Sequence, residues 1–384
     1  MCVVTFDWTQ NDAIDKFERY KKKPRLTWAV VELTEACNFN CIWCYANKGN
    51  NLKGTHMSKK RAFHLIKILA EAGLKQITCS GGEPLMYPYL KEFIKEANEY
   101  GLNIHIITNG YFLNEKLALE LKNLGLTQVQ TNIDSISPWK HDRNRGMKGS
   151  FKRAINALIA AKKVGLIAVS QTVLTKNNEN EIFDIFRLAR RLGLQRCRVW
   201  DLTPSQGKAF EIMDTMPSDY IGTLRDLSTF AYLSGAVSVE SGEPLFPLNF
   251  NTKLKVSGGF CVAMKGLYTT ISTQGNVLFC ATLRDPLYNI FEVEFDLQEY
   301  HKFSLEKYLN TYTLPSACLE CEYKSICNGG CLTRIRFNKN RYDYLCSRCN
   351  IKSKISYKIG LGHFPSQIVY QKQFQDKLTL DNPL

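Results

Sequence analysis

The 14 cysteines of this 384-residue chain fall into two groups, and this grouping constrains the fold more than any other feature. Three of them, Cys37, Cys41 and Cys44, lie within eight residues of one another. Eight more lie beyond residue 260: Cys261, Cys280, Cys318, Cys321, Cys327, Cys331, Cys346 and Cys349. A disulfide scaffold would spread its cysteines along the chain. Two dense groups on either side of a cysteine-poor stretch favour metal ligands instead.

Composition and charge point to an ordinary globular protein, with 45% hydrophobic and 22% charged residues and a net charge of +14. No apolar run approaches the roughly 20 residues that a membrane span needs. Residues 1–23 contain no signal-peptide core. We therefore expect a cytoplasmic protein that has no membrane segment and whose thiols stay reduced.

Residues 26–203 alternate short apolar runs with helical stretches, most of which stop at a glycine. Strands are predicted over 26–34, 76–79, 103–108, 127–133, 166–172 and 196–201. Helices are predicted over 58–72, 88–100, 115–124, 150–164 and 179–192. Strands that alternate with helices imply a parallel sheet with right-handed crossovers. Because six strands are two short of a closed barrel, this α/β pattern fits a partial (β/α)6 TIM-like barrel, although an open doubly wound sheet fits the count too.

The rest of the chain divides around this barrel. We expect an N-terminal extension over 1–25, the barrel over 26–203, a bridging region over 204–260 with a helix at 218–230, a cysteine-rich module over 261–350 and a basic tail over 351–384. The cysteine-rich module is loop-rich, with a hairpin at 268–279 that turns at 274–276. Such a module is expected to be held by metal rather than by a large core.

The first cysteine group, Cys37-x3-Cys41-x2-Cys44, directly follows the first predicted strand. Zinc sites normally gather four ligands in paired C-x2-C knuckles, and no fourth Cys or His is close by. A cubane iron–sulfur cluster is held by thiolates, normally four. With only three supplied, one iron keeps an open position for a substrate or cofactor, and this interpretation suits the triad better than zinc.

A C-x3-C-x2-C motif after the first strand of a βα series resembles the radical SAM superfamily. The resemblance implies that the open iron of a [4Fe–4S] cluster binds S-adenosyl-L-methionine. One electron then cleaves the sulfonium, and the resulting 5′-deoxyadenosyl radical abstracts a substrate hydrogen. The sequence Gly81-Gly82-Glu83-Pro84 after the second strand matches the family's motif near the methionine amino group.

Other cofactor contacts follow from the same resemblance. Trp43 stands where an aromatic residue lies near the adenine, and Val199 and Trp200 on the sixth strand are expected to flank that ring. Asn132 occupies the position of a serine that commonly contacts the ribose, and Gln171 lies where side chains reach the ribose or carboxylate. For Gln171 and Trp200, ordinary packing at a strand end is an equal alternative.

The second cysteine group resembles the SPASM extension of radical SAM enzymes, which carries two auxiliary [4Fe–4S] clusters. By this resemblance one cluster is held by Cys318, Cys321, Cys327 and Cys346. The other is held by Cys261, Cys280 and Cys331. Its fourth position is an open iron, a ligand other than cysteine, or Cys349, which is equally well explained as a bystander. The competing interpretation is zinc, because Cys318-x2-Cys321 is half of a zinc knuckle.

Basic clusters occur at 21–25 and 334–358. A solvated face is the plain explanation of such charge. Among functional explanations we rank neutralisation of anionic clusters and an acidic electron donor, flavodoxin or ferredoxin, first. An acidic peptide ranks next, and nucleic acid is ranked last.

The expected function is modification of a peptide or protein by crosslinking, epimerisation or oxidation, in a setting where oxygen is scarce. Only about 25 residues precede the first strand, too few for a leader-binding domain of roughly 80 residues, so either a separate recognition protein or a small substrate is expected. The alternative is maturation of a small cofactor such as a haem precursor. A distant alternative is a non-catalytic iron–sulfur or zinc protein that binds RNA.

Overall fold

The computed structural model describes residues 25–46, 49–203, 223, 226–227, 238–241, 255–256, 261–294, 296–314, 316–321, 324 and 329–337. Six parallel strands form its centre: β1 Trp28–Thr34, β2 Gln76–Gly81, β3 Asn103–Ile107, β4 Leu126–Asn132, β5 Ile167–Leu174 and β6 Arg196–Asp201. Each was predicted to within three residues at either end. The connecting helices are α2 Lys59–Glu71, α3 Leu90–Glu99, α4 Glu115–Asn123, α6 Ser150–Lys163 and α7 Ile182–Arg191.

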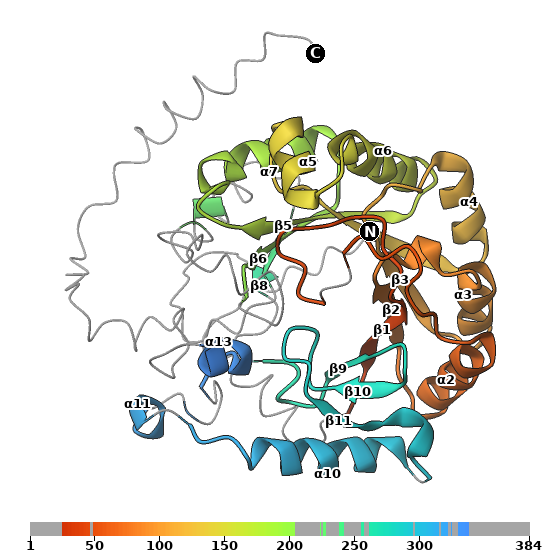
Figure 1. Cartoon of the computed structure of the whole chain (residues 1–384), viewed down its shortest axis with the longest axis vertical. Coiled ribbons are helices and arrows are strands. Elements are labelled where there is room, and N and C mark those ends of the chain that lie inside the picture. The colour runs from red at the N-terminus through yellow and green to blue at the C-terminus, as the bar shows by residue number, and fades with distance from the viewer. Residues whose placement is uncertain are drawn as a thin grey trace.

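The sheet curves without closing, as a partial TIM-like barrel does. Its strand order is β11-β10-β9-β1-β2-β3-β4-β5-β6-β7-β8, so the two end strands are not paired with each other. Figure 1 shows the helices α2, α3, α4, α6 and α7 along the outside of this arc. The predicted fold class is confirmed, and the open doubly wound sheet is not what forms.

One helix of the βα series was missed. α5, Pro138–Arg145, lies between β4 and α6. Pro138 opens it, Gly146 ends it in the left-handed conformation, and His141 is its only buried residue. Because an almost wholly polar helix has no apolar stripe, hydrophobic periodicity cannot reveal it.

The C-terminal part continues the barrel sheet. β9, Tyr268–Ile271, lies parallel to β1, and β10, Asn276–Leu278, and β11, Pro286–Asn289, follow it antiparallel. The predicted hairpin is therefore present, but its turn lies earlier than expected, because the Gly275 N–H donates to the Ser272 carbonyl at 2.9 Å. Two short strands, β7 Ser238–Ser241 and β8 Lys255–Val256, extend the other edge.

Three further helices were not predicted: α10 Leu297–Leu309, α11 Ser316–Leu319 and α13 Leu332–Phe337. Three short 3-10 turns complete the described elements: η1 Pro84–Met86, η2 Glu179–Glu181 and η4 Ile290–Glu292. Gln298 fixes α10 to the barrel, since its side chain accepts from the Leu26 N–H at 2.7 Å and donates to the Leu26 and Ala72 carbonyls. The predicted helix at 218–230 lies almost wholly outside the described residues. The domain boundaries remain predictions.

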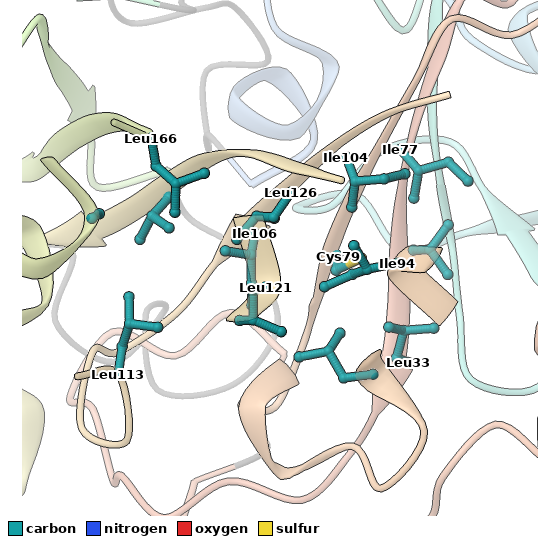
Figure 2. Close-up of a cluster of buried hydrophobic side chains, with 14 of the residues drawn as sticks. Leu33, Ile77, Cys79, Ile94, Ile104, Ile106, Leu113, Leu121, Leu126 and Leu166 are labelled. Carbon is teal, nitrogen blue, oxygen red and sulfur yellow. The ribbon is translucent and has the colours of Figure 1, made fainter. Parts of the chain in front are cut away.

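The main core lies between the sheet and its helices. Alternate strand residues such as Leu33, Ile77, Cys79 and Ile104 are fully buried there (Figure 2). Burial of each large apolar side chain contributes about 1.5–3 kcal/mol. Because strand side chains alternate between faces, the intervening residues face the inside of the arc.

That inner face is polar although it is buried. It carries Glu32 of β1, Thr78 and Ser80 of β2, and Gln128 and Gln130 of β4, each less than 9% exposed. Buried polar side chains on this face are more typical of a ligand-binding cavity than of a hydrophobic core. Among the described elements, no helix combines the length and apolar character that crossing a bilayer requires.

Candidate cofactor and cluster site

The candidate site lies where the six parallel strands end. Their carboxyl ends meet at one edge of the sheet, the usual place for sites in such folds. The cysteine triad follows β1, the Gly-Gly-Glu sequence overlaps the end of β2, and Asn132 and Trp200 lie at the ends of β4 and β6. Residues as far apart in the sequence as Cys37 and Trp200 are thereby brought to a single edge.

Backbone hydrogen bonds on two sides fix the loop that carries the triad. On one side, the Cys37 N–H donates to the Asn51 carbonyl at 2.9 Å, as part of a short antiparallel bridge. On the other side, the Asn40 N–H donates to the Arg145 carbonyl at 3.2 Å and the Ile42 N–H donates to the Asn144 carbonyl at 3.0 Å. The returning chain and the end of α5 thus clamp the loop between them.

The three thiols of this loop are partly buried neighbours. Burial raises the pKa of Cys37 to about 12, and the negative charges of Glu83, Cys41 and Cys44 act in the same direction. Burial also raises the pKa of Cys41. Cys37 and Cys41 would therefore need a positively charged group to hold them as thiolates.

A cluster fits this donor set better than a single ion does. Within the described residues, no three His, Cys, Asp or Glu side chains converge closely enough to hold one metal ion. A cubane binds each thiolate through a different iron, so its ligands stand further apart. The geometry of the triad agrees with the sequence-based preference for iron–sulfur over zinc.

Arg145 places a positive charge beside the triad. Its Nη1 donates to the Cys41 Sγ at 3.7 Å, and its Nη2 forms an ion pair with the fully buried Asp134. The guanidinium also lies over the Trp43 ring, 5.5 Å from its centroid. Asp134 is held in turn by the Val173 N–H at 3.1 Å. The sequence does not predict this network, because a local pattern does not show which thiol or carboxylate the side chain of Arg145 reaches.

The two glycines of the Gly-Gly-Glu sequence allow two backbone segments to meet. A Cβ at Gly81 would lie 2.2 Å from the Thr34 carbonyl oxygen, and one at Gly82 would lie 2.1 Å from that of Ala36. The Gly82 and Glu83 N–H groups donate to these two oxygens, both at 2.7 Å. Glycine is therefore required at both positions because the backbone there lies against the start of the cysteine loop.

Glu83 braces this region from within. Its carboxylate accepts from the Thr108 hydroxyl at 2.6 Å, the Asn109 N–H at 2.7 Å and the Leu85 N–H at 3.1 Å. Burial raises the pKa of Glu83 to about 7, although these three hydrogen bonds lower it. Since both oxygens are taken by protein donors, Glu83 positions the turn rather than presenting a free carboxylate.

Two indoles at the site have N–H groups without a protein acceptor. The Nε1 atoms of Trp43 and Trp200 are buried and make no hydrogen bond within the described structure. Trp43 packs with Leu202 and Val173, and Val173 is the strand partner of Trp200. Because buried N–H groups are nearly always paired, these two indoles fit an edge where a bound molecule supplies acceptors.

The remaining predicted contacts have mixed outcomes. Asn132 and Gln171 are paired across β4 and β5 at the site. The side-chain Oε1 of Gln171 accepts a hydrogen bond from the side-chain amide of Gln130 at 2.6 Å, so one of its polar atoms already has a protein partner. The expectation that Val199 flanks the adenine is wrong. Val199 is fully buried in the core between the sheet and the helices, on the opposite face of β6 from Trp200.

The C-terminal cysteines are partly brought together. Cys261 and Cys280 are neighbours, and burial raises the pKa of Cys261 to about 11. The Cys280 Sγ accepts from the Leu283 N–H at 3.1 Å and lies 4.0 Å from the hydroxyl of Thr333, two residues after Cys331. Cys318 and Cys321 are joined by a backbone hydrogen bond of 3.3 Å. The predicted ligands Cys327 and Cys346, together with Cys349, lie outside the described residues.

Two buried ion pairs join these C-terminal segments to the barrel. Arg284, just beyond Cys280, binds both carboxylate oxygens of Glu32 on β1 at 2.7 and 2.8 Å. Arg334 of α13 pairs with Asp201 at the end of β6 at 3.1 Å, and both side chains are fully buried. A sequence signal existed for Glu32 alone, as a lone charge within the apolar run of β1.

Comparisons with known proteins agree with this geometry. Residues 31–189 match the model of the Radical SAM superfamily. The chain is 28% identical to the AdoMet-dependent heme synthase of Methanosarcina barkeri (strain Fusaro / DSM 804) over 328 residues, 81% of this chain and 92% of that protein. It is 27% identical to the sporulation killing factor maturation protein SkfB of Bacillus subtilis (strain 168) over 50% of this chain and 46% of that protein.

Among solved structures, Streptococcus suis SuiB bound to S-adenosylmethionine superposes with a TM-score of 0.67, at 18% identity, covering 88% of this chain and 81% of that one. This likeness concerns the fold. The match of residues 31–189 to the family model identifies this part of the partial barrel as a radical SAM domain. Such a domain implies a [4Fe–4S] cluster and S-adenosylmethionine.

Proposed function

We propose that this chain is a radical SAM enzyme whose active site is the edge described above. The observation that carries the proposal is the fixed loop of Cys37, Cys41 and Cys44, clamped between the returning chain and α5 beside the Gly-Gly-Glu turn. When bound there, a [4Fe–4S] cluster supplies the electron that splits S-adenosylmethionine into methionine and a 5′-deoxyadenosyl radical.

The protein residues around the triad have separable tasks in this proposal. Gly81 and Gly82 hold the end of β2 against the start of the cysteine loop, and Glu83 ties that turn to the end of β3. Trp43 and Trp200 offer two N–H donors and two flat faces to the nucleoside. Asn132 and Gln171 border the same region from β4 and β5.

We further propose that the C-terminal cysteines hold two auxiliary clusters in a SPASM-type arrangement. The proximity of Cys261, Cys280 and the start of α13 supports the set that includes Cys331. The set of Cys318, Cys321, Cys327 and Cys346 rests on its spacing and on the turn that joins the first two. The ion pairs Glu32–Arg284 and Arg334–Asp201 would keep both sets at a fixed distance from the barrel.

Two substrate classes have support. A haem precursor is favoured by the breadth of the match to a relative named AdoMet-dependent heme synthase, which spans most of both chains. Peptide or protein modification, the first expectation from sequence, is supported by the match to SkfB over half of this chain. We rank the haem precursor first because the match that supports it is longer.

The test of the chemistry is the electron paramagnetic resonance signal of the reconstituted, reduced protein. With all three triad ligands present, S-adenosylmethionine should alter part of the signal, since it binds an open iron. In Cys41→Ala this response should be lost, while iron in the C-terminal segments is retained. Cys79→Ala is the matched control, because Cys79 is buried between the sheet and the helices and faces away from the site. A response that persists in Cys41→Ala would mean that the triad is misassigned.

A further inference from the structure

α5 offers an exposed surface next to the cysteine triad. Its carbonyls at Asn144 and Arg145 accept hydrogen bonds from the cysteine loop, and its Arg145 guanidinium contacts Cys41. Figure 1 shows α5 at the rim of the arc, alongside α6 and α7. A protein that docked on the outer face of α5 would therefore lie one helix away from Cys41.

The exposed face of α5 and its flanking loops is basic. Arg143 and Lys148 are exposed and form no ion pair among the described residues, and Lys176 is exposed on the neighbouring loop after β5. Asp142 is the only acidic residue between positions 138 and 153. Its carboxylate accepts from the N–H groups of Gly149 and Phe151 at the start of α6, so its negative charge stabilises the N-terminus of α6.

Not every cation of α5 contributes to this excess, because Lys140 pairs with Glu181. On α2 and α3, Lys67 and Lys95 likewise each face a glutamate one turn away, Glu71 and Glu99. Arg143 and Lys148 have no such acidic partner among the described residues. Their excess positive charge makes this face complementary to an acidic protein.

Apolar side chains are exposed on the same face. Trp139 of α5 is 62% exposed, and Ile136, just before the helix, is 39% exposed. An exposed tryptophan among cations is the composition of a protein-binding surface, since aromatic residues at the centre supply binding energy and charges at the rim guide association.

We propose that the outer face of α5, centred on Trp139, Arg143 and Lys148, docks an acidic one-electron carrier protein. This inference rests on the proposed function, which consumes one electron for each S-adenosylmethionine cleaved. The reduced carrier is oxidised by one electron, and the C5′–S bond breaks. Methionine leaves with two electrons on sulfur, and the deoxyadenosyl fragment retains one. An acidic carrier complements the charge of this face, and docking here shortens the path to Cys41.

The experiment compares two electron sources, reduced flavodoxin and dithionite, in the reconstituted full chain. In Arg143→Glu/Lys148→Glu, the flavodoxin-driven rate of 5′-deoxyadenosine formation at low salt should fall by about tenfold or more. The dithionite-driven rate should stay within about twofold of wild type, because a small reductant needs no docking surface. Raising the ionic strength should slow the wild type and have little effect on the variant.

The control, Lys302→Glu/Lys307→Glu, makes the same charge change on α10, which lies across the molecule from α5 (Figure 1). An equal loss in this control would overturn the proposal, since net charge alone would then explain the effect. An unchanged flavodoxin rate in the α5 variant would also overturn it, and would leave RNA or an acidic peptide as the occupant. If the charge reversal impairs folding, Trp139→Ala replaces it as the test variant. This variant should slow the flavodoxin-driven reaction and leave the dithionite-driven reaction unchanged. Absence of dithionite-driven product in the wild type would instead refute the proposed function.

Discussion

At the scale of single residues, Glu83 shows how a family motif can have a structural cause. The sequence motif predicts that Glu83 lies next to a cofactor, yet its carboxylate accepts hydrogen bonds from Thr108, Asn109 and Leu85. A buried carboxylate with three donors joins the ends of β2 and β3. The motif thus preserves the shape of the edge on which a cofactor is proposed to bind.

The raised pKa of Glu83 gives a pH-dependent stability with a defined sign. Its folded pKa of about 7 lies above the ordinary value of 4.5, so the folded state binds the proton more tightly than the unfolded state. Stability from this group is therefore present at low pH and is lost as pH rises from about 4.5 to 7, by about 3 kcal/mol at most. Three histidines whose pKa values are lowered by burial, His105, His141 and His301, act in the opposite direction over this range. The effect of Glu83 is therefore the difference in unfolding free energy between wild type and Glu83→Gln, measured by denaturant unfolding of the cluster-free, reduced protein, and this difference should shift against the wild type between pH 5 and 7.5. Parallel pH profiles for the two proteins would refute the assignment.

The residues that the sequence could not reveal are those whose partners lie far along the chain. The sequence reveals the triad through the spacing of its cysteines, because all three lie within eight residues of one another. By contrast, Glu32 and Arg284 are 252 positions apart, and Arg145 reaches Cys41 across 104. Such pairs exist only after the sheet has brought the segments together, so a local pattern can mark Glu32 as a lone charge but cannot identify its partner.

At the scale of elements, the strands and amphipathic helices of the barrel could be predicted, and α5 could not. Five of the six strands follow a glycine by one to three residues. Four of the five predicted helices bury a clear stripe against the sheet. α5 buries only His141, yet its carbonyls hold the cysteine loop. A polar helix can thus be essential to the site and invisible to periodicity.

The junction between β2 and the cysteine loop gives a second prediction. Gly81→Ala would place a methyl group 2.2 Å from the Thr34 carbonyl oxygen, at a φ of +124°. The two segments must then separate, and we expect both the unfolding free energy and the iron content after reconstitution to fall. Gly101→Ala is the control, since Gly101 also has a positive φ of +74° but nothing lies within 4 Å of its added Cβ. That control should lose only about 1–2 kcal/mol and retain its iron. Equal iron in both variants would show that the close contact does not matter for the site.

At the scale of the whole molecule, the C-terminal segment is part of the barrel sheet rather than an appended module. β9 pairs with β1, and the pairing joins residues about 240 positions apart. Local sequence predicted the hairpin but not its partner, because a Tyr-Thr-Thr-Ile strand has no apolar run to mark it as the neighbour of a buried strand. The fold thereby fixes Cys261 and Cys280, which flank β9 and β10 in the sequence, relative to the triad.

The buried pair Arg334–Asp201 tests this attachment. Removal of one partner leaves an uncompensated buried charge, so Arg334→Met should cost about 3–5 kcal/mol. Replacement of both, in Asp201→Leu/Arg334→Met, should recover part of that loss, and a double-mutant cycle measured by denaturant unfolding gives the coupling. Strict additivity of the two single changes would indicate that the ion pair does not hold α13 to β6.

The most direct test of the account as a whole is the amount of 5′-deoxyadenosine formed when the anaerobically reconstituted protein is reduced with dithionite in the presence of S-adenosylmethionine. The account predicts product from wild type and from Cys79→Ala, and none above background from Cys37→Ala, Cys41→Ala or Cys44→Ala. Equal product from wild type and the three triad variants, or no product from any of them, would contradict it.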